Sequence, residues 1–115
     1  MYYLNTPKPG TIQWVKYWHK AAGGRWFSPS VQSKYGTTFS KSVYPIKNGA
    51  YFISCEQPSL MLSTGLVKEP KRYTVQFFDR GTGQIKAASG FMQFETLQQA
   101  KTAAQLMKTN HGALV

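Results

Sequence analysis

The sequence has little acid, and its few acidic residues are unevenly placed. Four Asp and Glu residues stand against fourteen Lys and Arg in 115 positions, so the formal net charge is +10. Residues 1–55 contain no acid at all. A surplus of one sign on this scale costs stability through self-repulsion, and an anionic partner relieves that cost. The charge pattern therefore favours a negatively charged partner over a role for basic charge in solubility alone.

Residues that commonly carry catalysis are also scarce. Cys55 is the only cysteine, which excludes an internal disulfide, and a free cysteine in a strand-like run is more often a small buried side chain than a nucleophile. The two histidines, His19 and His111, lie near opposite ends of the chain. The four carboxylates have no paired spacing for acid–base work, and no cluster has metal-ligand spacing. The composition therefore predicts a binding protein rather than an enzyme, with no cofactor and no metal.

Long hydrophobic runs are missing as well. No segment approaches the ~18 apolar residues of a membrane span, and the first five residues lack the basic start and apolar run of a signal peptide. We therefore expect a cytoplasmic protein without a membrane partner. Hydrophobic residues still make up 42% of the chain and aromatic residues 15%, which is typical of a packed globule rather than a disordered chain. With neither repeat nor charged linker, residues 1–115 are expected to form one domain.

Two segments have the pattern of amphipathic helices. Thr11 is a suitable N-cap, and most apolar side chains that follow it fall on one arc of a helical wheel before a pair of glycines. Near the C-terminus, Thr96 and Gln99 match a capping box, and a narrow stripe of Leu, Ala and Met follows them. The sequence therefore predicts helices over residues 11–22 and 96–109.

The first half of the intervening stretch has strand patterns. Residues 25–28 form a short strand-like run that Pro29 ends. Residues 37–44 are rich in β-branched, aromatic and hydroxyl side chains. The pair at positions 48 and 49, Asn-Gly, is typical of a hairpin turn, and residues 50–55 are its expected partner strand.

The second half contains the clearest alternation. Residues 72–78 predict a strand with Tyr73, Val75 and Phe77 facing inward and with Thr74 and Gln76 facing outward. After a glycine turn, residues 84–94 are expected to return as a strand with a bulge near residues 89–90.

Residues 57–70 have no clear period and contain several apolar side chains. We expect them to form a loop that packs down on the body or contacts a partner. Together with the helices and strands, they predict an α+β fold: an antiparallel sheet of four or five strands, with the N-terminal and C-terminal helices packed on it.

Basic and aromatic residues are interleaved at several places. Lys and Arg neutralise phosphates, and exposed aromatic rings stack on bases. Aromatic residues are also ordinary core residues, and we expect Trp14 and Trp18 in the core, whereas Trp26 and Tyr35 suit core and surface equally. The candidate nucleic-acid contacts are Lys16, Lys20, Arg25, Trp26, Lys34, Tyr35, Lys71, Arg72 and Arg80.

About a third of the chain resembles a known arrangement. The strand at residues 71–77, the glycine turn, the next strand and the helix beginning near Thr96 are similar to the sheet-plus-helix DNA-binding domains of tyrosine-integrase arm regions, which place a small sheet in the major groove. The same helix is similar to the last helix of double-stranded-RNA-binding domains, but Gln98 and Gln99 stand where that family has a lysine pair. The strand–turn–strand–helix pattern is common in small proteins.

Two functions therefore stay open. The first is a nucleic-acid-binding protein, with DNA favoured over RNA, that contacts phosphates through Lys and Arg. The second is a protein-binding inhibitor or regulator whose basic face docks on an acidic partner protein. Exposure of the apolar residues between Leu60 and Val67 would favour the second function, because contiguous exposed apolar patches mark protein interfaces.

Overall fold

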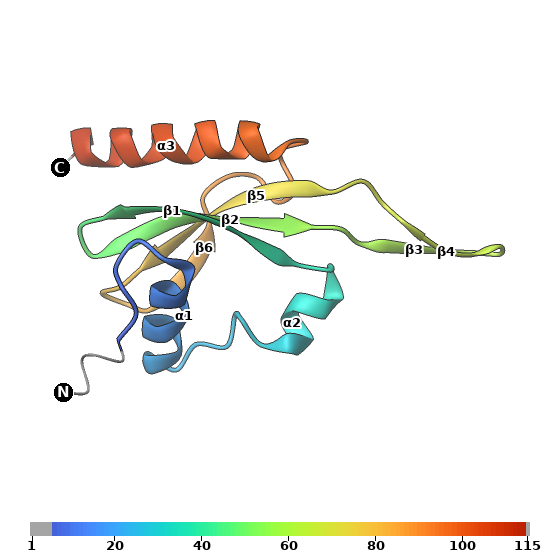
Figure 1. The fold of residues 1–115 in the computed structure, drawn as a ribbon, viewed down its shortest axis with the longest axis horizontal. Coiled ribbons are helices and arrows are strands. Elements are labelled where there is room, and N and C mark those ends of the chain that lie inside the picture. Colours follow the sequence, from blue (N-terminus) through green and yellow to red (C-terminus); the bar gives the residue numbers. More distant parts are fainter. Residues whose placement is uncertain (1–5, 115) are drawn as a thin grey trace.

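The computed structural model describes residues 6–114, except for the side chains at positions 31, 34 and 112–114. It has the α+β architecture that the sequence predicts, with a central four-stranded antiparallel sheet in the order β1-β2-β5-β6. The strands of this sheet are β1 (Thr38–Ile46), β2 (Gly49–Glu56), β5 (Arg72–Asp79) and β6 (Gln84–Ala87). Helix α3 (Leu97–Leu114) lies on one face of the sheet, while α1 (Ile12–Ala21) and the short α2 (Pro29–Lys34) lie on the other (Figure 1).

Local signals at its two ends define α1. The Thr11 hydroxyl accepts a hydrogen bond from the backbone N–H of Trp14 at 3.2 Å. At the other end, Gly23 has a φ of 88°, and the N–H of Gly24 donates to the carbonyl of His19 at 2.9 Å. This bond is part of a Schellman motif, which ends a helix at a glycine with positive φ.

The capping box predicted at the start of α3 is confirmed. The backbone N–H of Gln99 donates to the Thr96 hydroxyl at 3.1 Å, and the Gln99 side-chain oxygen accepts from the Thr96 N–H at 3.3 Å. The helix runs to Leu114, beyond the predicted end at residue 109. The glycine at position 112 does not stop it, because a glycine inside a helix costs only about 1 kcal/mol relative to alanine.

Strands β2 and β5 form the centre of the sheet and are buried on both faces. They pair along their whole length, from Gly49 opposite Asp79 to Glu56 opposite Arg72. The hairpin between β1 and β2 turns at Asn48, whose φ is 64°, as the Asn-Gly pair predicts.

One face of these two strands forms an apolar core under α3. Ile53 and Val75 are fully buried there, against Ala100 and Ala104 of the helix. The inward orientation predicted for alternate residues of β5 is confirmed on this face, where Tyr73 and Val75 pack in the same cluster.

The opposite face is also covered, which the sequence analysis did not anticipate. Val15 of α1 packs with Phe52 and Phe78 in a second buried cluster. Thr74 and Gln76 were expected to face outward, but their exposed fractions are 0% and 4%. That expectation is wrong because other segments lie over this side of the sheet. Gln76 lines a cavity together with Trp26 from the segment after α1, and Thr74 accepts a hydrogen bond from the backbone N–H of Met92, in the loop after β6.

Two predicted strand segments differ in the structure. Residues 25–28 form a turn that leads into α2, with Pro29 in the first helical turn, where a missing N–H costs nothing. The strand expected over residues 84–94 ends at Ala87. Beyond it, the backbone N–H groups of Ala88 and Ser89 still donate to the Val75 carbonyl at 2.8 and 3.2 Å, and Phe94 pairs with Tyr73 in an isolated bridge.

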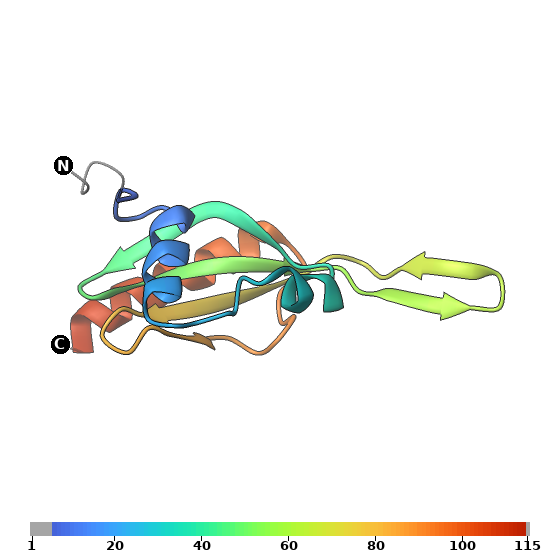
Figure 2. The same ribbon diagram turned by 90° about the horizontal axis from the view of Figure 1, so that it is seen from below.

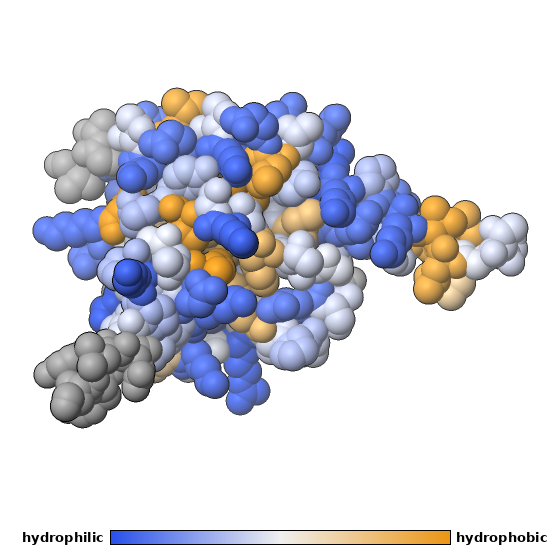
Figure 3. Space-filling view, viewed as in Figure 1, coloured by the Kyte–Doolittle hydropathy of each residue, from blue (hydrophilic) through white to orange (hydrophobic). Residues whose placement is uncertain are grey.

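The largest departure concerns residues 57–70. They do not pack down but form a two-stranded arm, with β3 (Ser59–Leu62) paired to β4 (Gly65–Lys68), that projects from the body (Figures 1 and 2). The side chains of Met61 and Leu66 are 70% and 68% exposed, and apolar surface gathers near the arm's end (Figure 3). The expected loop is wrong because the two strands pair with each other, and the expected packing on the body is wrong because every residue of both strands is exposed. The alternative, contact with a partner, stays a prediction.

Within residues 6–114, no helix has both the length and the apolar character needed to cross a membrane.

Candidate nucleic-acid interface

The segment at residues 24–28, between α1 and α2, is held by one buried histidine. His19 is 6% exposed; its Nε2 accepts a hydrogen bond from the backbone N–H of Trp26 at 3.1 Å, and its Nδ1 lies 2.6 Å from the Gly83 carbonyl. A backbone N–H can only donate, so the ring is the neutral tautomer with its proton on Nδ1, which donates to Gly83. His19 thereby joins α1 to the segment and to the β5–β6 turn.

The same contact explains why a glycine stands at position 24. A Cβ atom on Gly24 would collide with the ring of His19. The backbone therefore approaches the imidazole more closely than any other residue would allow. This close approach allows a sharp turn after α1, which places Arg25 and Trp26 beside the helix.

On one side of this segment lies a cleft of about 290 Å³, which we call the basic cleft. It is lined by Lys16, His19, Lys20, Gly24, Arg25, Phe27 and Ser28. Lys16, Lys20 and Arg25 are exposed, and no residue of the lining is acidic. The ammonium of Lys16 lies 5.5 Å from the ring centre of Phe27, where the face of an aromatic ring attracts a cation.

On the other side of the segment lies a smaller cavity of about 220 Å³, which we call the aromatic pocket. Its lining consists of Trp26, Gln32, Tyr35, Thr37, Glu56, Gln76, Ala87 and Phe91. Glu56 and Gln76 are 1% and 4% exposed and form the inner part of the lining. Tyr35 and Phe91 are exposed, and their ring centres lie 5.2 Å apart in an edge-to-face contact.

A hydrogen-bonded network holds the polar groups beneath the aromatic pocket. The hydroxyl of Thr74 donates to a carboxylate oxygen of Glu56 at 2.7 Å, and the Gln76 amide donates to the Ser54 hydroxyl at 3.1 Å. Burial raises the pKa of the Glu56 carboxyl, while hydrogen bonds from Ser54 and Thr74 partly oppose that rise. The network fixes a carboxyl and an amide, which can both accept and donate hydrogen bonds, at the inner end of a ring-lined cavity.

The two residues predicted to stack on bases, Trp26 and Tyr35, line the same cavity. Trp26 is half-buried, and its ring centre lies 5.5 Å from that of Phe39 and 5.8 Å from that of Phe52. Part of its ring therefore belongs to the core, and the rest faces the aromatic pocket. Tyr35 is 36% exposed.

Arg80 lies in the turn after β5, near α1. Its guanidinium stacks over the ring of Trp18 at 3.9 Å, a cation–π contact that orders the side chain while leaving it exposed. Trp14 and Trp18 both pack against the core, as the sequence predicts.

The Lys71-Arg72 pair lies elsewhere. These residues stand at the opposite end of β5 from Arg80, about 25 Å away at the usual rise per strand residue. Arg72 is half-buried and donates to the carbonyl of Gln93 at 3.1 Å, so it holds the loop before α3. The side chain of Lys34 is among those that the structure does not describe. Of the candidate contacts, the structure thus groups Lys16, Lys20 and Arg25 in one cleft.

Sequence reasoning missed Glu56, Gln76 and Phe91. A signal was available for the first two. Gln76 shares a strand face with Phe78, and Glu56 shares one with Phe52. The neighbouring positions, Ile53 and Val75, place large apolar residues on the opposite face of the same strands. Such strands are typical of a sheet covered on both sides. No comparable signal marks Phe91, because its place depends on the chain leaving the sheet after β6.

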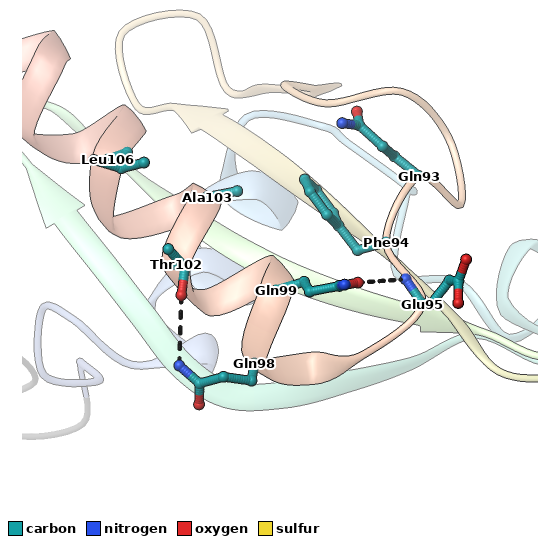
Figure 4. Close-up of a pocket in the computed structure, with 8 residues that line it drawn as sticks. All are labelled: Gln93, Phe94, Glu95, Gln98, Gln99, Thr102, Ala103 and Leu106. Carbon is teal, nitrogen blue, oxygen red and sulfur yellow. Dashed lines mark hydrogen bonds between the residues drawn. The ribbon is translucent and has the colours of Figure 1, made fainter.

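A wider groove runs beside the start of α3 (Figure 4). It has a volume of about 590 Å³ and is lined by Gln93, Phe94, Glu95, Gln98, Gln99, Thr102, Ala103 and Leu106. Gln99 bonds to the backbone N–H of Glu95 at 3.0 Å, as the dashed line in Figure 4 marks, and Gln98 bonds to Thr102. With its amides engaged and no basic residue in its lining, the groove does not suit phosphates.

Among residues 6–114, no group of three or more His, Cys, Asp or Glu side chains is placed to hold a metal ion.

Comparison with known proteins gives one match. A family model matches residues 11–105, a range that includes α1, α2, all six strands and half of α3. The basic cleft, the aromatic pocket and the arm all lie within it. No curated protein and no solved structure matches the chain. The chain belongs to the matched family, which is described as a family of unknown function (DUF7447).

Proposed function

We propose that this chain is a nucleic-acid-binding protein that holds backbone phosphates in the basic cleft. The observation that carries the proposal is the convergence of Lys16 and Lys20, from α1, with Arg25, from the next segment, on one cleft without an acid. Three like charges so close repel one another, and a phosphate between them removes that repulsion. Arg80, ordered on Trp18, is a further phosphate contact on the same side of the sheet.

The salt dependence of binding tests this proposal. Fluorescence anisotropy would follow labelled single- and double-stranded DNA and RNA over a series of salt concentrations. The three contacts of the basic cleft alone predict a slope of log affinity against log salt of about −2.7 for duplex DNA and about −2 for single strands, and a contact from Arg80 would steepen it by about one unit or less. The triple variant Lys16→Gln/Lys20→Gln/Arg25→Gln is expected to flatten the slope by about two units.

A matched control removes the same charge from other places. Lys41, Lys47 and Lys86 are exposed and lie on β1, in the β1–β2 turn and on β6. Their triple substitution with Gln is expected to change the slope by less than one unit, because they line neither cavity. Equal flattening by both triple variants, or weak association with every nucleic acid that disappears by physiological salt, would overturn the proposal.

The arm favours a second candidate function, an inhibitor or regulator that docks on an acidic partner protein. Five large apolar side chains of the arm are between 44% and 70% exposed: Leu60, Met61, Leu62, Leu66 and Val67. Exposed contiguous apolar surface marks interfaces, and a two-stranded ribbon is at best marginally stable alone. A partner that covers the arm would bury its apolar side chains and would stabilise its two strands.

The charges near the arm indicate what such a partner is like. Lys68 and Lys71 are exposed at and just beyond the base of β4, while Glu69 between them is half-buried. The exposed charge there is positive, so an apolar groove bordered by acidic residues is the complementary surface. A second copy of the chain is disfavoured, because each copy carries a charge of +10.

Site-specific crosslinking tests this candidate. A photo-crosslinker would replace Met61, and Tyr17, 44% exposed on α1, would be the control position. A protein crosslinked only from the arm should then bind the purified chain, and Met61→Ser/Leu66→Ser should weaken that binding at least tenfold. Crosslinks to a second copy, or an affinity that the double variant leaves unchanged, would exclude this candidate.

A further inference from the structure

The aromatic pocket has the size and walls of a site for a single flat ring. Its volume of about 220 Å³ lies below the ~300–1,000 Å³ of pockets for drug-sized ligands. Trp26, Tyr35 and Phe91 supply ring surfaces from three separate segments. Aromatic side chains placed in this way bind the faces of heteroaromatic rings by stacking.

The inner end of the pocket has free hydrogen-bonding capacity. An ionised carboxylate has about four acceptor sites, and the Glu56 carboxyl receives hydrogen bonds from Thr74 and Ser54. The Gln76 amide has two N–H donors and an acceptor oxygen, and its bond to Ser54 uses one of the donors. The pocket therefore offers acceptors on both residues and a donor on Gln76.

The pocket and the basic cleft are neighbours through the chain itself. Arg25 lines the cleft, and the next residue, Trp26, lines the pocket. Their α-carbons are about 3.8 Å apart, as in any trans peptide. One strand of nucleic acid can therefore place a phosphate on one side of the segment and a base on the other.

From these observations we infer that the aromatic pocket binds one unstacked nucleobase, and that it prefers a base with an exocyclic amino group. This inference rests on the proposed function for its setting beside bound phosphates. Proteins that take a base out of its stack hold it between apolar or aromatic side chains and bond to its polar edge. Here Trp26, Tyr35 and Phe91 supply ring surface against one face of the base, and Glu56 and Gln76 bond to its edge.

The preference follows from the number of donors on the base. An amino group carries two N–H donors and can satisfy the oxygen atoms of Glu56 and Gln76 together. Thymine and uracil present one ring N–H and leave one of those acceptors without a partner. Since a correct pair of hydrogen bonds discriminates by about 1–3 kcal/mol, thymidine and uridine are expected to bind at least fivefold more weakly than the best of adenosine, guanosine and cytidine.

Nucleosides without phosphate test the pocket apart from the basic cleft. NMR titration of the full chain would follow the indole N–H of Trp26 and the side-chain amide of Gln76 as each nucleoside is added. Saturable shifts at both groups are expected for an amino-bearing nucleoside. Equal responses to all five nucleosides, or none, would overturn the inference.

Exposed residues supply variants that leave the fold intact. Phe91→Ala removes a ring that is 54% exposed in the pocket lining and is expected to weaken nucleoside binding at least fivefold. Tyr17→Ala, which removes an exposed ring outside the pocket, is the matched control and should leave the affinity within twofold. An unchanged affinity in Phe91→Ala would place the nucleoside elsewhere and overturn the inference.

Failure of this inference is distinguishable from failure of the proposed function. The triple variant of the basic cleft should bind nucleosides normally while losing affinity for strands. If strands bind with the expected salt slope but nucleosides do not bind, the inference is wrong and the proposed function stands. If nucleosides bind in the pocket but strands do not bind in the cleft, the proposed function is wrong, and the inference that the pocket binds a nucleobase stands.

Discussion

The two buried faces of the sheet differ in chemistry, although the same two strands supply both. Under α3, Ile53 and Val75 meet alanines in a contact without polar side chains at its centre. On the other face, Phe52 and Phe78 are followed along their strands by the buried polar groups that end at Glu56. A sheet face that buries only apolar side chains can be optimised for packing alone. Burial of a hydrogen-bonded carboxyl costs stability, and such a cost is typical of a face that binds a ligand. Under the proposed function, the α3 face provides stability and the other face provides binding.

The largest expected effect comes from a cavity on the α3 face. Ile53→Ala removes a fully buried side chain and should lower the free energy of unfolding by about 2–5 kcal/mol. Denaturant titration would measure the loss. Below its melting temperature, the variant should bind nucleic acid within twofold of wild type, because Ile53 lines neither the basic cleft nor the aromatic pocket. A folded variant that had lost binding would break the proposed division between the faces.

A smaller effect is expected from overfilling the same face. Ala104 is fully buried in the middle of the stripe on α3, and Ala104→Gln should destabilise the fold by about 1–3 kcal/mol through crowding and burial of an amide. Thr102→Gln, on the exposed side of the helix, should be nearly neutral. Equal melting temperatures for the two variants would show that the α3 contact is not tightly packed.

Sequence reasoning succeeded where the determinants of structure are local. The caps at Thr11 and Thr96, the Asn48 turn and the strand at β5 each depend on a few neighbouring residues, and the structure contains all of them. These signals were sufficient for the fold class. The sequence was also sufficient to name Lys16, Lys20 and Arg25 as candidate phosphate contacts. It did not show that they line one cleft, because the turn that brings Arg25 beside α1 depends on His19 and Gly24.

The errors share one physical cause. Alternation along a strand tells which residues share a face, but not whether another layer covers that face. Thr74 and Gln76 were expected to be outward because a polar face usually meets water, and here the segment after α1 and the loop after β6 cover it. The apolar residues around Met61 were expected to pack on the body or contact a partner, and the structure contradicts the first alternative because they are exposed on the arm. Both outcomes depend on contacts between distant segments, which a residue pattern does not encode.

The polar face is tested by removing one hydroxyl from its network. The Thr74 side chain donates to Glu56 and accepts from the backbone N–H of Met92, each at 2.7 Å. Thr74→Val keeps the shape but removes one hydrogen bond from each partner, so it should cost about 1–2 kcal/mol. Thr38→Val, at an exposed position of β1, is the matched control and should be neutral by thermal unfolding. A neutral Thr74→Val would mean that the network contributes nothing to stability.

The smallest expected effect is a pH dependence that arises from Glu56. Burial raises the pKa of this carboxyl above its ordinary value of 4.5. Between the ordinary and the raised pKa, the folded protein binds the proton more tightly than the unfolded chain, so this group lowers the free energy of unfolding as the pH rises. The destabilisation that the charged carboxylate causes is absent at a pH below the ordinary pKa and complete at a pH above the raised pKa. Glu56→Gln has no such titration, and its melting temperature relative to wild type should therefore increase with pH through that window.

Thermal unfolding across a pH series from about 4 to 7 would measure this difference, with Glu95→Gln as a matched control that removes an exposed carboxyl. The expected change is small, because the hydrogen bonds from Ser54 and Thr74 oppose the effect of burial. A bound amino-bearing nucleoside should reduce it further, since N–H donors favour the charged carboxylate. A Glu56→Gln difference that stays constant across the series would show that the carboxyl is not desolvated, and the contrast between the two faces would then be one of shape alone.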